Sequence, residues 1–432
     1  MTWCGSAPTP ADLPDIVGGD EIHVVYAVPS DGTDRFPQLA TPIAADVGAI
    51  GDWWRTQDAT RAPRFDLAAF FCSGAGALDI SDVRLPHPTA YYNTATPRLQ
   101  LLRDDLVAAG FDDPAKKYLV YYDQQRPATG TDCGAAYVNA DAGGEHGYAA
   151  VYLAPNLAGC GTAGNGGYLA VVAAHELVSE LGALAPGTPD PPHRCPTDPL
   201  HVCDSSADVL APRPAVASLA KAVLDHGHDD YYAHGGAWWD VQDSPWLRRL
   251  DQGEFPVRVV VGKGGASVSD VDRRSVTCAS SRCTWTWPAQ AKIVLTATAA
   301  GGRHLVRWIG CPRAAAATCS FTVDAPASVT AVFAPAVAVS RFHLAFSAGG
   351  RRLTATLRST PPDVAKAFGC VFGRLQPVAS SLSAGVATCQ WDVPSRFRGH
   401  RIVGVVALRA GGEVVLTKRF RVRVPAWRGN RR

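Results

Sequence analysis

The chain has 432 residues, of which 47% are hydrophobic and 19% are charged, and its formal net charge is +2. This length allows two to four domains, and the near balance of charge gives no argument for nucleic acid or a membrane surface as the partner of the whole chain. The sequence contains no specific nucleic-acid motif and no apolar run that approaches the length of a transmembrane helix.

The first half of the sequence alternates between strand and helix patterns. Glu21–Val28 is apolar and β-branched and predicts a strand, whereas Pro37–Gln57 carries apolar residues near helical spacing and predicts a helix that packs on it. Thr96–Gly110 predicts a second helix, with a proline near its start and a glycine as its stop. Further strands are predicted at Phe65–Cys72, Leu78–Leu85, Lys117–Asp123 and Gly147–Ala154. This alternation predicts an α/β layered domain.

The stretch Gly166–Leu184 predicts the most buried helix of this domain. It starts after two glycines, continues with small and apolar residues, and is ended by a Pro/Gly-rich run. His175 and Glu176 lie in its middle. Two adjacent ionisable residues in an otherwise apolar helix make this stretch the main candidate for chemistry.

The segment that follows this helix is irregular. Pro186–Pro214 is rich in proline and aspartate and predicts a loop, and Ala215–Asp225 predicts a helix after it. His226–His234 is suited either to binding a cation or to a polar turn that holds its two tyrosines against the core. We place the end of the first domain near Glu254, so that it covers residues 1–254.

The rest of the chain has β character. Short β runs separated by turn residues predict a small all-β module over residues 255–335. Residues 336–432 predict a second all-β domain, a sandwich. In it Thr417–Pro425 alternates cleanly, which places three basic residues on one face: Arg419, Arg421 and Arg423. The expected architecture is therefore multidomain, with an N-terminal α/β (α+β) layered domain followed by two all-β domains.

The twelve cysteines favour disulfides and an oxidising compartment, because their number is even and several are close neighbours. Four local pairs are expected: Cys195 with Cys203, Cys278 with Cys283, Cys311 with Cys319, and Cys370 with Cys389. The first residues carry no signal peptide. We expect a secreted or cell-surface protein whose leader has been removed or whose start is assigned too late.

The pair His175-Glu176 is the first half of the H-E-x-x-H zinc signature, in which two imidazoles one turn apart hold the metal and the glutamate activates its water. With the preceding strands and helix, the run HELVSELG resembles the core of the metzincin branch of the zincin metallopeptidases, over roughly residues 20 to 250. The resemblance implies a zincin-like fold, a zinc cofactor and peptide or protein substrates. It also implies that His175 is the first zinc ligand, Glu176 the general base and Gly182 the turn that ends the helix.

The sequence departs from this pattern at three positions. Ser179 stands where the second ligand belongs, Ala185 where a third histidine would fall, and Leu210 where the family has the methionine of its Met-turn. Serine is too short and too weakly basic to replace an imidazole, and a catalytic zinc normally has three protein ligands. Candidate replacements come from the following loop and beyond, first His193 and His201, then Asp204, Asp208, His226, His228 and His234.

Four interpretations follow from these residues. We favour a secreted bacterial metallopeptidase-related protein whose peptide hydrolysis is weakened or lost because of Ser179. The alternatives are an active zinc peptidase completed by loop ligands, an unrelated α/β hydrolase, and a purely structural protein in which His175 is an ordinary core histidine. The competing class to the enzyme is an extracellular binding or adhesion protein that uses the domain as a scaffold.

The two β segments suggest accessory roles. Residues 256 to 334, with Trp308-x-Gly310-Cys311 and a terminal V-T-A-V-F, resemble the divergent InlB-type B-repeat module of bacterial surface proteins, which implies a non-catalytic extracellular piece. Residues 336–432 hold 17 Arg and Lys against 3 Asp and Glu. Such a domain is suited to anionic cell-surface polymers, or else the arginines only form a solvated strand face.

Overall fold

The computed structural model describes residues 3, 9–70, 76–94, 97–124, 132–137, 147–153, 159–164, 166–185, 191–273, 276–362, 364–410 and 413–426. The chain divides into two compact units. The first comprises Met1–Val260, Ser269–Thr296 and Gly310–Val329, and the second comprises Val261–Val268, Ala297–Ile309 and Thr330–Arg432. Parts of the middle β module belong to each unit, so the two predicted boundaries between the three domains remain predictions.

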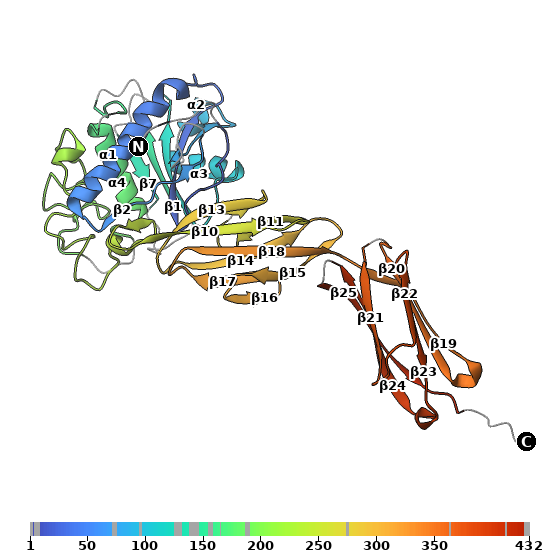
Figure 1. The fold of residues 1–432 in the computed structure, drawn as a ribbon. Helices are drawn as coiled ribbons and strands as arrows, with labels where there is room; N and C mark the ends of the chain where they lie inside the picture. The colour runs from blue at the N-terminus through green and yellow to red at the C-terminus, as the bar shows by residue number, and fades with distance from the viewer. Residues whose placement is uncertain are drawn as a thin grey trace, which may run out of the picture. The chain divides into compact units, whose positions relative to one another are not determined.

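The first unit is built on a five-stranded sheet in the order β5-β1-β6-β8-β7. Its strands are β1 (Glu21–Val28), β5 (Ile80–Arg84), β6 (Lys116–Tyr122), β7 (Gly134–Ala136) and β8 (Tyr148–Tyr152). Figure 1 labels two of these strands, β1 and β7. The short edge strand β7 runs antiparallel to β8, whereas the other pairings are parallel. Every residue of β1 is buried, as expected for a parallel strand covered on both faces. The predicted strand at these residues is confirmed.

Helices cover both faces of this sheet. The helices α1 (Phe36–Gln57) and α4 (Tyr168–Glu180) contact each other, and their apolar residues share one core with Val24 and Tyr26 of β1. On the opposite face, α3 (Arg98–Ala108) and the short α2 (Thr89–Tyr92) share a second core with Val25 and Ala27. Successive strand residues thus point to opposite layers. This arrangement confirms the predicted α/β layered domain.

The central helix α4 owes its position to small side chains. Alanine and valine fill its first half, so its backbone packs closely against the sheet and almost all of its residues are buried. Gly182 ends it with a φ of 100°, a conformation that glycine adopts without the clash a Cβ would bring. The turn predicted at this residue is therefore present.

One predicted helix is absent. In place of a helix over Ala215–Asp225 the structure has a single 3-10 turn, η1 (Leu219–Lys221). Asp225 has a φ of 60°, and its carboxylate accepts the backbone N–H groups of Tyr231 and Tyr232. These bonds hold the chain after Asp225 in consecutive turns. Within the predicted helix, the backbone N–H groups of Leu219 and Val223 bond to the carbonyl oxygens of Gly166 and Ala207 and not along a helix. Both tyrosines are buried, as the polar-turn interpretation expects.

The predicted strand Phe65–Cys72 is also shorter than expected. Only β3 (Leu67–Ala68) forms, paired with β4 (Ala77–Leu78), while Phe65 makes a single parallel bridge to Ile22. Residues 71–75 lie outside the described part of the chain. The remaining short elements of this region are β2 (Arg61–Pro63), η2 (Val241–Asp243) and β9 (Leu247–Arg249).

The middle module consists of antiparallel strands. Within the first unit β10 (Glu254–Val261) pairs with β13 (Arg282–Pro288), and β17 (Thr318–Thr322) pairs with β14 (Lys292–Ala299) and β16 (Arg313–Ala315). In the second unit the main part of β18 (Ala327–Pro335) pairs with β15 (Arg303–Ile309). The two other strands are β11 (Gly265–Asp270) and β12 (Thr277–Cys278).

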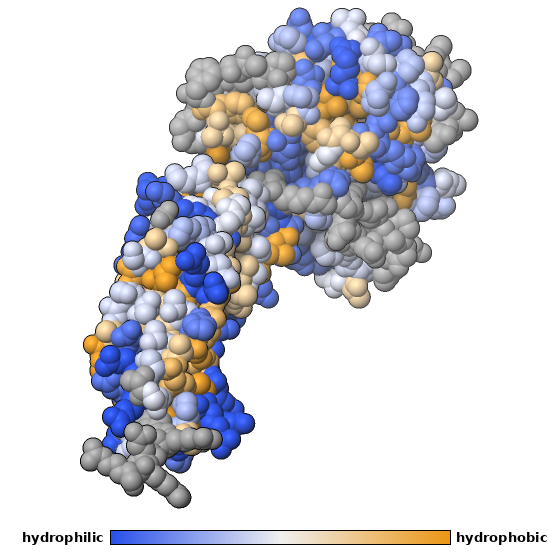
Figure 2. Space-filling view, turned by 90° about the vertical axis from the view of Figure 1, so that its right-hand side faces the viewer, coloured by the Kyte–Doolittle hydropathy of each residue, from blue (hydrophilic) through white to orange (hydrophobic). Residues whose placement is uncertain are grey.

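The end of the second unit holds two antiparallel sheets around one core. One has the order β19-β20-β23-β22 and the other the order β21-β24-β25. Their bounds are β19 (Ala338–Ser347), η3 (Ala348–Gly350), β20 (Arg352–Thr360), β21 (Ala367–Phe372), β22 (Ala379–Ser383), β23 (Val386–Asp392), η4 (Ser395–Phe397), β24 (Arg401–Ala410) and β25 (Glu413–Arg423). Phe420 and Trp391 meet in the shared core, whereas Arg419, Arg421 and Arg423 are exposed. On the face seen in Figure 2, hydrophilic and hydrophobic residues are mixed over the unit that carries these strands. The predicted fold class, α/β followed by all-β, is confirmed.

Five disulfides join described cysteines. Four are the predicted local pairs, and the fifth, Cys133–Cys160, was not expected from the sequence. Cys4 and Cys72 lie outside the described residues. Within the described residues, no helix combines the length and the apolar character needed to cross a membrane. Multiple disulfides are consistent with an extracellular protein.

Candidate active site

A cavity of about 930 Å³ opens beside α4. Its floor is formed by one face of that helix, one wall by the edge strand β7 and the other by the loop between residues 198 and 214. The helix contributes its polar side chains to this floor: His175, Glu176 and Ser179. Residues 175 and 179 share a face because they are four apart on a helix, so the structure brings this predicted pair together with the base.

His175 is oriented by the loop that passes beneath it. Its Nδ1 lies 2.7 Å from the carbonyl oxygen of Val209, to which it donates its proton, so Nε2 carries the free lone pair. Burial lowers the pKa of His175 to about 4, with a further contribution from His201. The imidazole is therefore neutral at pH 7, the form that serves as a ligand or hydrogen-bond acceptor. Val209 belongs to the segment predicted at the Met-turn position, where Leu210 is fully buried.

Glu176 is a buried carboxyl group beside the edge strand. Its side chain is 8% exposed, and burial, with Asp132 adding to it, raises the pKa of Glu176 to about 8. Without a bound cation the group is therefore mostly protonated at pH 7. In that form it donates a hydrogen bond, and it becomes a proton acceptor only when it ionises.

This pKa predicts how stability depends on pH. A folded-state pKa of about 8 against 4.5 means that ionising Glu176 costs stability as the pH rises through that interval. We expect Glu176→Gln to become more stable than the wild type as the pH rises from 5 to 8, by at most about 1.4 kcal/mol for each pH unit. Denaturant titrations at four pH values measure the difference. If the free energies of unfolding of the two proteins change with pH in parallel, the raised pKa of Glu176 is contradicted.

Gly134 of β7 leaves space for the side chain of Glu176 because it has no Cβ. A Cβ placed on Gly134 would lie 2.6 Å from Oε1 of Glu176 and 2.8 Å from the carbonyl oxygen of Ala150, closer than real Cβ atoms come. We expect Gly134→Ala to lower the free energy of unfolding by about 1–3 kcal/mol and to displace the Glu176 carboxyl group. Thermal unfolding and any Glu176-dependent activity are the measurements. Gly235→Ala is the matched control, since a Cβ there meets no atom within 4 Å, and equal effects of the two changes would count against this packing.

Of the two loop histidines predicted as ligands, the structure brings one to the cavity. His201 faces His175 with ring centroids 5.1 Å apart, and its Nδ1 lies 2.8 Å from a carboxylate oxygen of Asp198. His193 does not line the cavity. Its backbone N–H donates to Asp230, and its Nδ1 lies 3.2 Å from the other oxygen of that carboxylate.

These residues do not form a three-ligand zinc site. Among the described residues, no group of three ligand atoms within 4.8 Å of one another includes an atom of His175. The helix supplies one imidazole, Ser179 occupies the position of the second, and His201 lies on the opposite wall, where its Nδ1 pairs with Asp198. A catalytic zinc needs three protein ligands, so the donor set as it stands does not fit the ion.

Two features of the cavity were missed from the sequence. The edge strand β7 is only three residues long and contains glycine and alanine, which give no strand pattern. The disulfide Cys133–Cys160 fixes the start of this strand to the segment before α4. Four cysteines remain after the local pairs are assigned, namely Cys4, Cys72, Cys133 and Cys160, and the sequence does not show how they pair.

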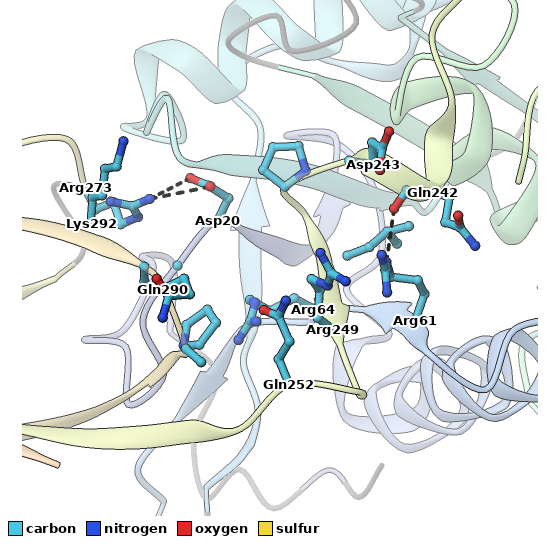
Figure 3. Close-up of a pocket in the computed structure, with 17 residues that line it drawn as sticks. Asp20, Arg61, Arg64, Gln242, Asp243, Arg249, Gln252, Arg273, Gln290 and Lys292 are labelled. Atoms are coloured by element: carbon cyan, nitrogen blue, oxygen red, sulfur yellow. Dashed lines mark hydrogen bonds and ion pairs between the residues drawn. The ribbon is translucent and has the colours of Figure 1, made fainter. Parts of the chain in front are cut away.

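A second, smaller cavity of about 270 Å³ lies in the same unit (Figure 3). Several basic side chains line it, but carboxylates already pair with them. Arg64 lies 3.2 Å from Glu254, and Arg273 lies 3.3 Å from Asp20. The pairing leaves this cavity with a largely balanced charge. The candidate active site is therefore the larger cavity.

No protein family and no curated protein matches the sequence. Among solved structures, wild-type OgpA from Akkermansia muciniphila is similar over 99% of both chains, at 9% sequence identity and a TM-score of 0.29. A catalytically inactive OgpA in complex with an O-glycopeptide (glycodrosocin) substrate is similar over 98% of this chain and 97% of its own, at 10% identity and a TM-score of 0.28. A DUF3823 family protein from Bacteroides ovatus is similar over 40% of this chain and 100% of its own, at 11% identity and a TM-score of 0.18. These TM-scores are too low for the likeness to support a functional conclusion.

Proposed function

We propose that the protein is a secreted, zincin-like metallopeptidase-related protein that keeps a peptide-binding cleft and has weakened or lost peptide hydrolysis. One observation carries the proposal. His175 and Glu176 lie on the floor of a large cavity, but Ser179 occupies the helical position from which a second imidazole would reach the same point. The loss of a ligand removes metal affinity first and leaves the cleft in place.

The edge strand supports the binding of an extended peptide. β7 is the last strand of the sheet and lines the cavity, so the edge away from β8 faces the space where a ligand would lie. An extended peptide adds to such an edge through backbone hydrogen bonds. The neutral Nε2 of His175 accepts a hydrogen bond from such a ligand, and the protonated carboxyl group of Glu176 donates one.

Metal content and hydrolysis test this proposal. We expect the purified full chain, dialysed against zinc and then against buffer, to hold much less than one equivalent of zinc. It should cleave neither casein nor a peptide library above a His175→Ala control. Stoichiometric zinc that is lost in His175→Ala, together with hydrolysis, would overturn the proposal.

A second candidate keeps hydrolysis and takes His201 as a replacement ligand. The 5.1 Å between the two ring centroids favours it, because a modest shift of the loop would bring both imidazoles to one ion. In that case His201→Ala removes both zinc and activity, whereas His193→Ala leaves both unchanged. Under the first proposal neither change alters the zinc content.

The basic sandwich is proposed as an adhesion domain for anionic cell-surface polymers. Its arginines at 419, 421 and 423 are exposed on one strand, and residues 336–432 hold 17 basic against 3 acidic residues. We expect the protein to bind immobilised heparin at low salt and to elute below about 0.5 M NaCl, since salt screens exposed charges. Replacing the three arginines by serine should lower the eluting salt concentration, and an unchanged elution would assign them to a solvated face only.

A further inference from the structure

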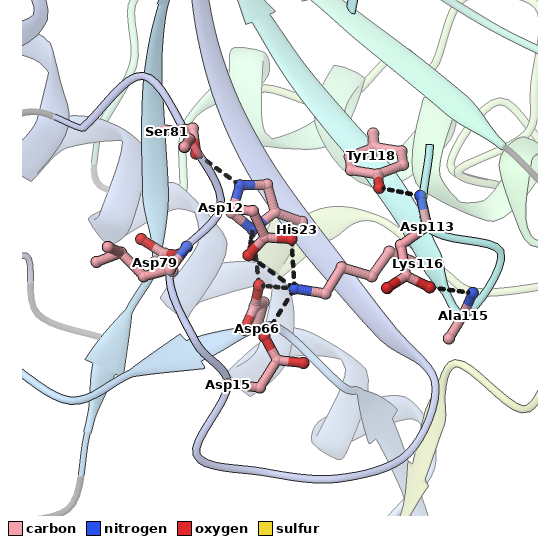
Figure 4. Close-up of polar contacts among 12 residues, drawn as sticks. Asp12, Asp15, His23, Asp66, Asp79, Ser81, Asp113, Ala115, Lys116 and Tyr118 are labelled. Atoms are coloured by element: carbon pink, nitrogen blue, oxygen red, sulfur yellow. Dashed lines mark hydrogen bonds and ion pairs between the residues drawn. The ribbon is translucent and has the colours of Figure 1, made fainter. Parts of the chain in front are cut away.

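A buried group of charged side chains lies at the start of β1 and β6 (Figure 4). We call it the Lys116 cluster, and it consists of Asp12, Asp15, Glu21, His23, Asp66, Asp79 and Lys116. Nζ of Lys116 lies 2.7 Å from Asp12, 2.8 Å from Asp15 and 2.6 Å from Asp66. None of these residues lines the cleft beside α4.

The cluster holds more acidic than basic groups. Five carboxyl groups face two basic side chains, Lys116 and His23. Nδ1 of His23 lies 2.7 Å from Oδ2 of Asp66 and 3.6 Å from Oδ1 of Asp12. Arg64 is close enough to act on Glu21, but its guanidinium pairs with Glu254. The acidic excess must be balanced by protons or by a bound cation.

Glu21 is a carboxyl group of the cluster whose oxygens lack hydrogen-bond partners. Its side chain is completely buried, and neither of its carboxylate oxygens has a hydrogen-bond partner. Oδ1 of Asp66 is also buried without a partner, whereas Oδ2 of Asp66 accepts from His23 and Lys116. Because these oxygens reach no solvent and bond to no donor, ionised carboxylates here are costly unless a positive charge lies between them.

The spacing of the oxygens fits a calcium ion. Asp15, Glu21 and Asp66 each offer an oxygen within 4.8 Å of the other two. Calcium binds oxygens at about 2.3–2.6 Å, so two of its ligands lie up to about 5 Å apart. The set contains only carboxylates, which suits a hard cation and not zinc or copper. His23 adds no nitrogen ligand, because Nδ1 is bonded to Asp66 and Nε2 to Ser81.

We propose that Asp15, Glu21 and Asp66 form a structural calcium site, with Lys116 bonded to the carboxylates of Asp15 and Asp66 beside it. The ion would join three segments that are distant in sequence, namely the N-terminal segment, the start of β1 and the loop before β3. Its role is to hold these segments together, and it is independent of any chemistry in the cleft.

Calcium binding to the full chain tests this site. After treatment with EGTA, we expect Ca²⁺ to bind with one equivalent by calorimetry and to raise the melting temperature by about 5 °C or more. Tb³⁺, added in place of Ca²⁺, should give luminescence sensitised by nearby aromatic side chains that Ca²⁺ then displaces. Glu21→Gln should abolish both signals, and Asp15→Asn gives the same test if the first variant does not fold.

Two control variants separate this site from the rest of the protein. Asp229→Asn removes one ligand of the second acidic group, formed by His193, Asp229 and Asp230, and His175→Ala removes the cleft imidazole. Both should keep the calcium response. The proposal is overturned if no saturable binding occurs, if Mg²⁺ gives an equal response, or if binding survives Glu21→Gln and disappears in Asp229→Asn. Absence of binding would show that protons alone balance the cluster.

Discussion

Replacing Lys116 by methionine is expected to lower the free energy of unfolding by about 3–5 kcal/mol at pH 7, because removing one partner of a buried ionic group leaves the other charges uncompensated. Lys116 is 1% exposed and contacts three carboxylates. The change therefore removes the main positive charge of the Lys116 cluster. Denaturant unfolding of the full chain measures the loss.

The pH dependence of this loss identifies its cause. Without Lys116 the folded-state pKa values of Asp12, Asp15 and Asp66 rise, so the variant binds protons more tightly when folded. Its deficit should therefore be smallest near pH 4, where these carboxyl groups are protonated, and should grow as the pH rises. Lys117→Met is the matched control on the same strand, where burial lowers the pKa of the lysine and Glu180 is its acidic neighbour. A deficit that stays constant with pH would argue for lost packing instead.

Replacing Ser179 by histidine is expected to create a zinc site. Residue 179 is 6% exposed, lines the cavity and shares a helical face with His175. A second imidazole there restores the pair that holds zinc in the H-E-x-x-H pattern, with His201 within reach as a third ligand. We expect about one equivalent of zinc and a rise in peptide hydrolysis of at least about 100-fold over the wild type, the lower range for general acid–base catalysis.

Three variants define what this result means. Ser381→His places the same side chain on exposed β22 and should change neither zinc content nor activity. Ser179→His combined with Glu176→Gln should bind zinc without hydrolysis, because the proton acceptor is lost. If Ser179→His folds but binds no zinc, then the orientation of His175 toward Val209 is not the one that a zinc site requires.

The sequence predicted helices and strands correctly where a single local pattern of residues determines the element. β1 was predicted to the residue, and α4 was predicted with two extra residues at its start and four at its end, since a β-branched run and a run of small apolar residues each suit one buried environment. The helix expected at Ala215–Asp225 is absent because the backbone N–H groups of Leu219 and Val223 bond to the carbonyl oxygens of Gly166 and Ala207. Such partners lie outside any local period.

The candidate site was predicted in part for the same reason. His175 and Glu176 follow from a short motif on one helix, but the approach of His201 depends on the path of a loop rich in proline. The Lys116 cluster was not predicted at all. Its acidic residues are spread from position 12 to position 79 and meet only when the strands are placed side by side.

The disulfide between Cys370 and Cys389 has a mechanical consequence. It joins β21 to β23, which belong to different sheets of the C-terminal sandwich. A force that pulls on the two ends of the chain passes through this covalent link and bypasses the 19-residue interval between the cysteines. Under tension, for example when the sandwich is attached to a surface in flowing liquid, the residues between the two cysteines, which include β22, cannot extend until the disulfide is reduced.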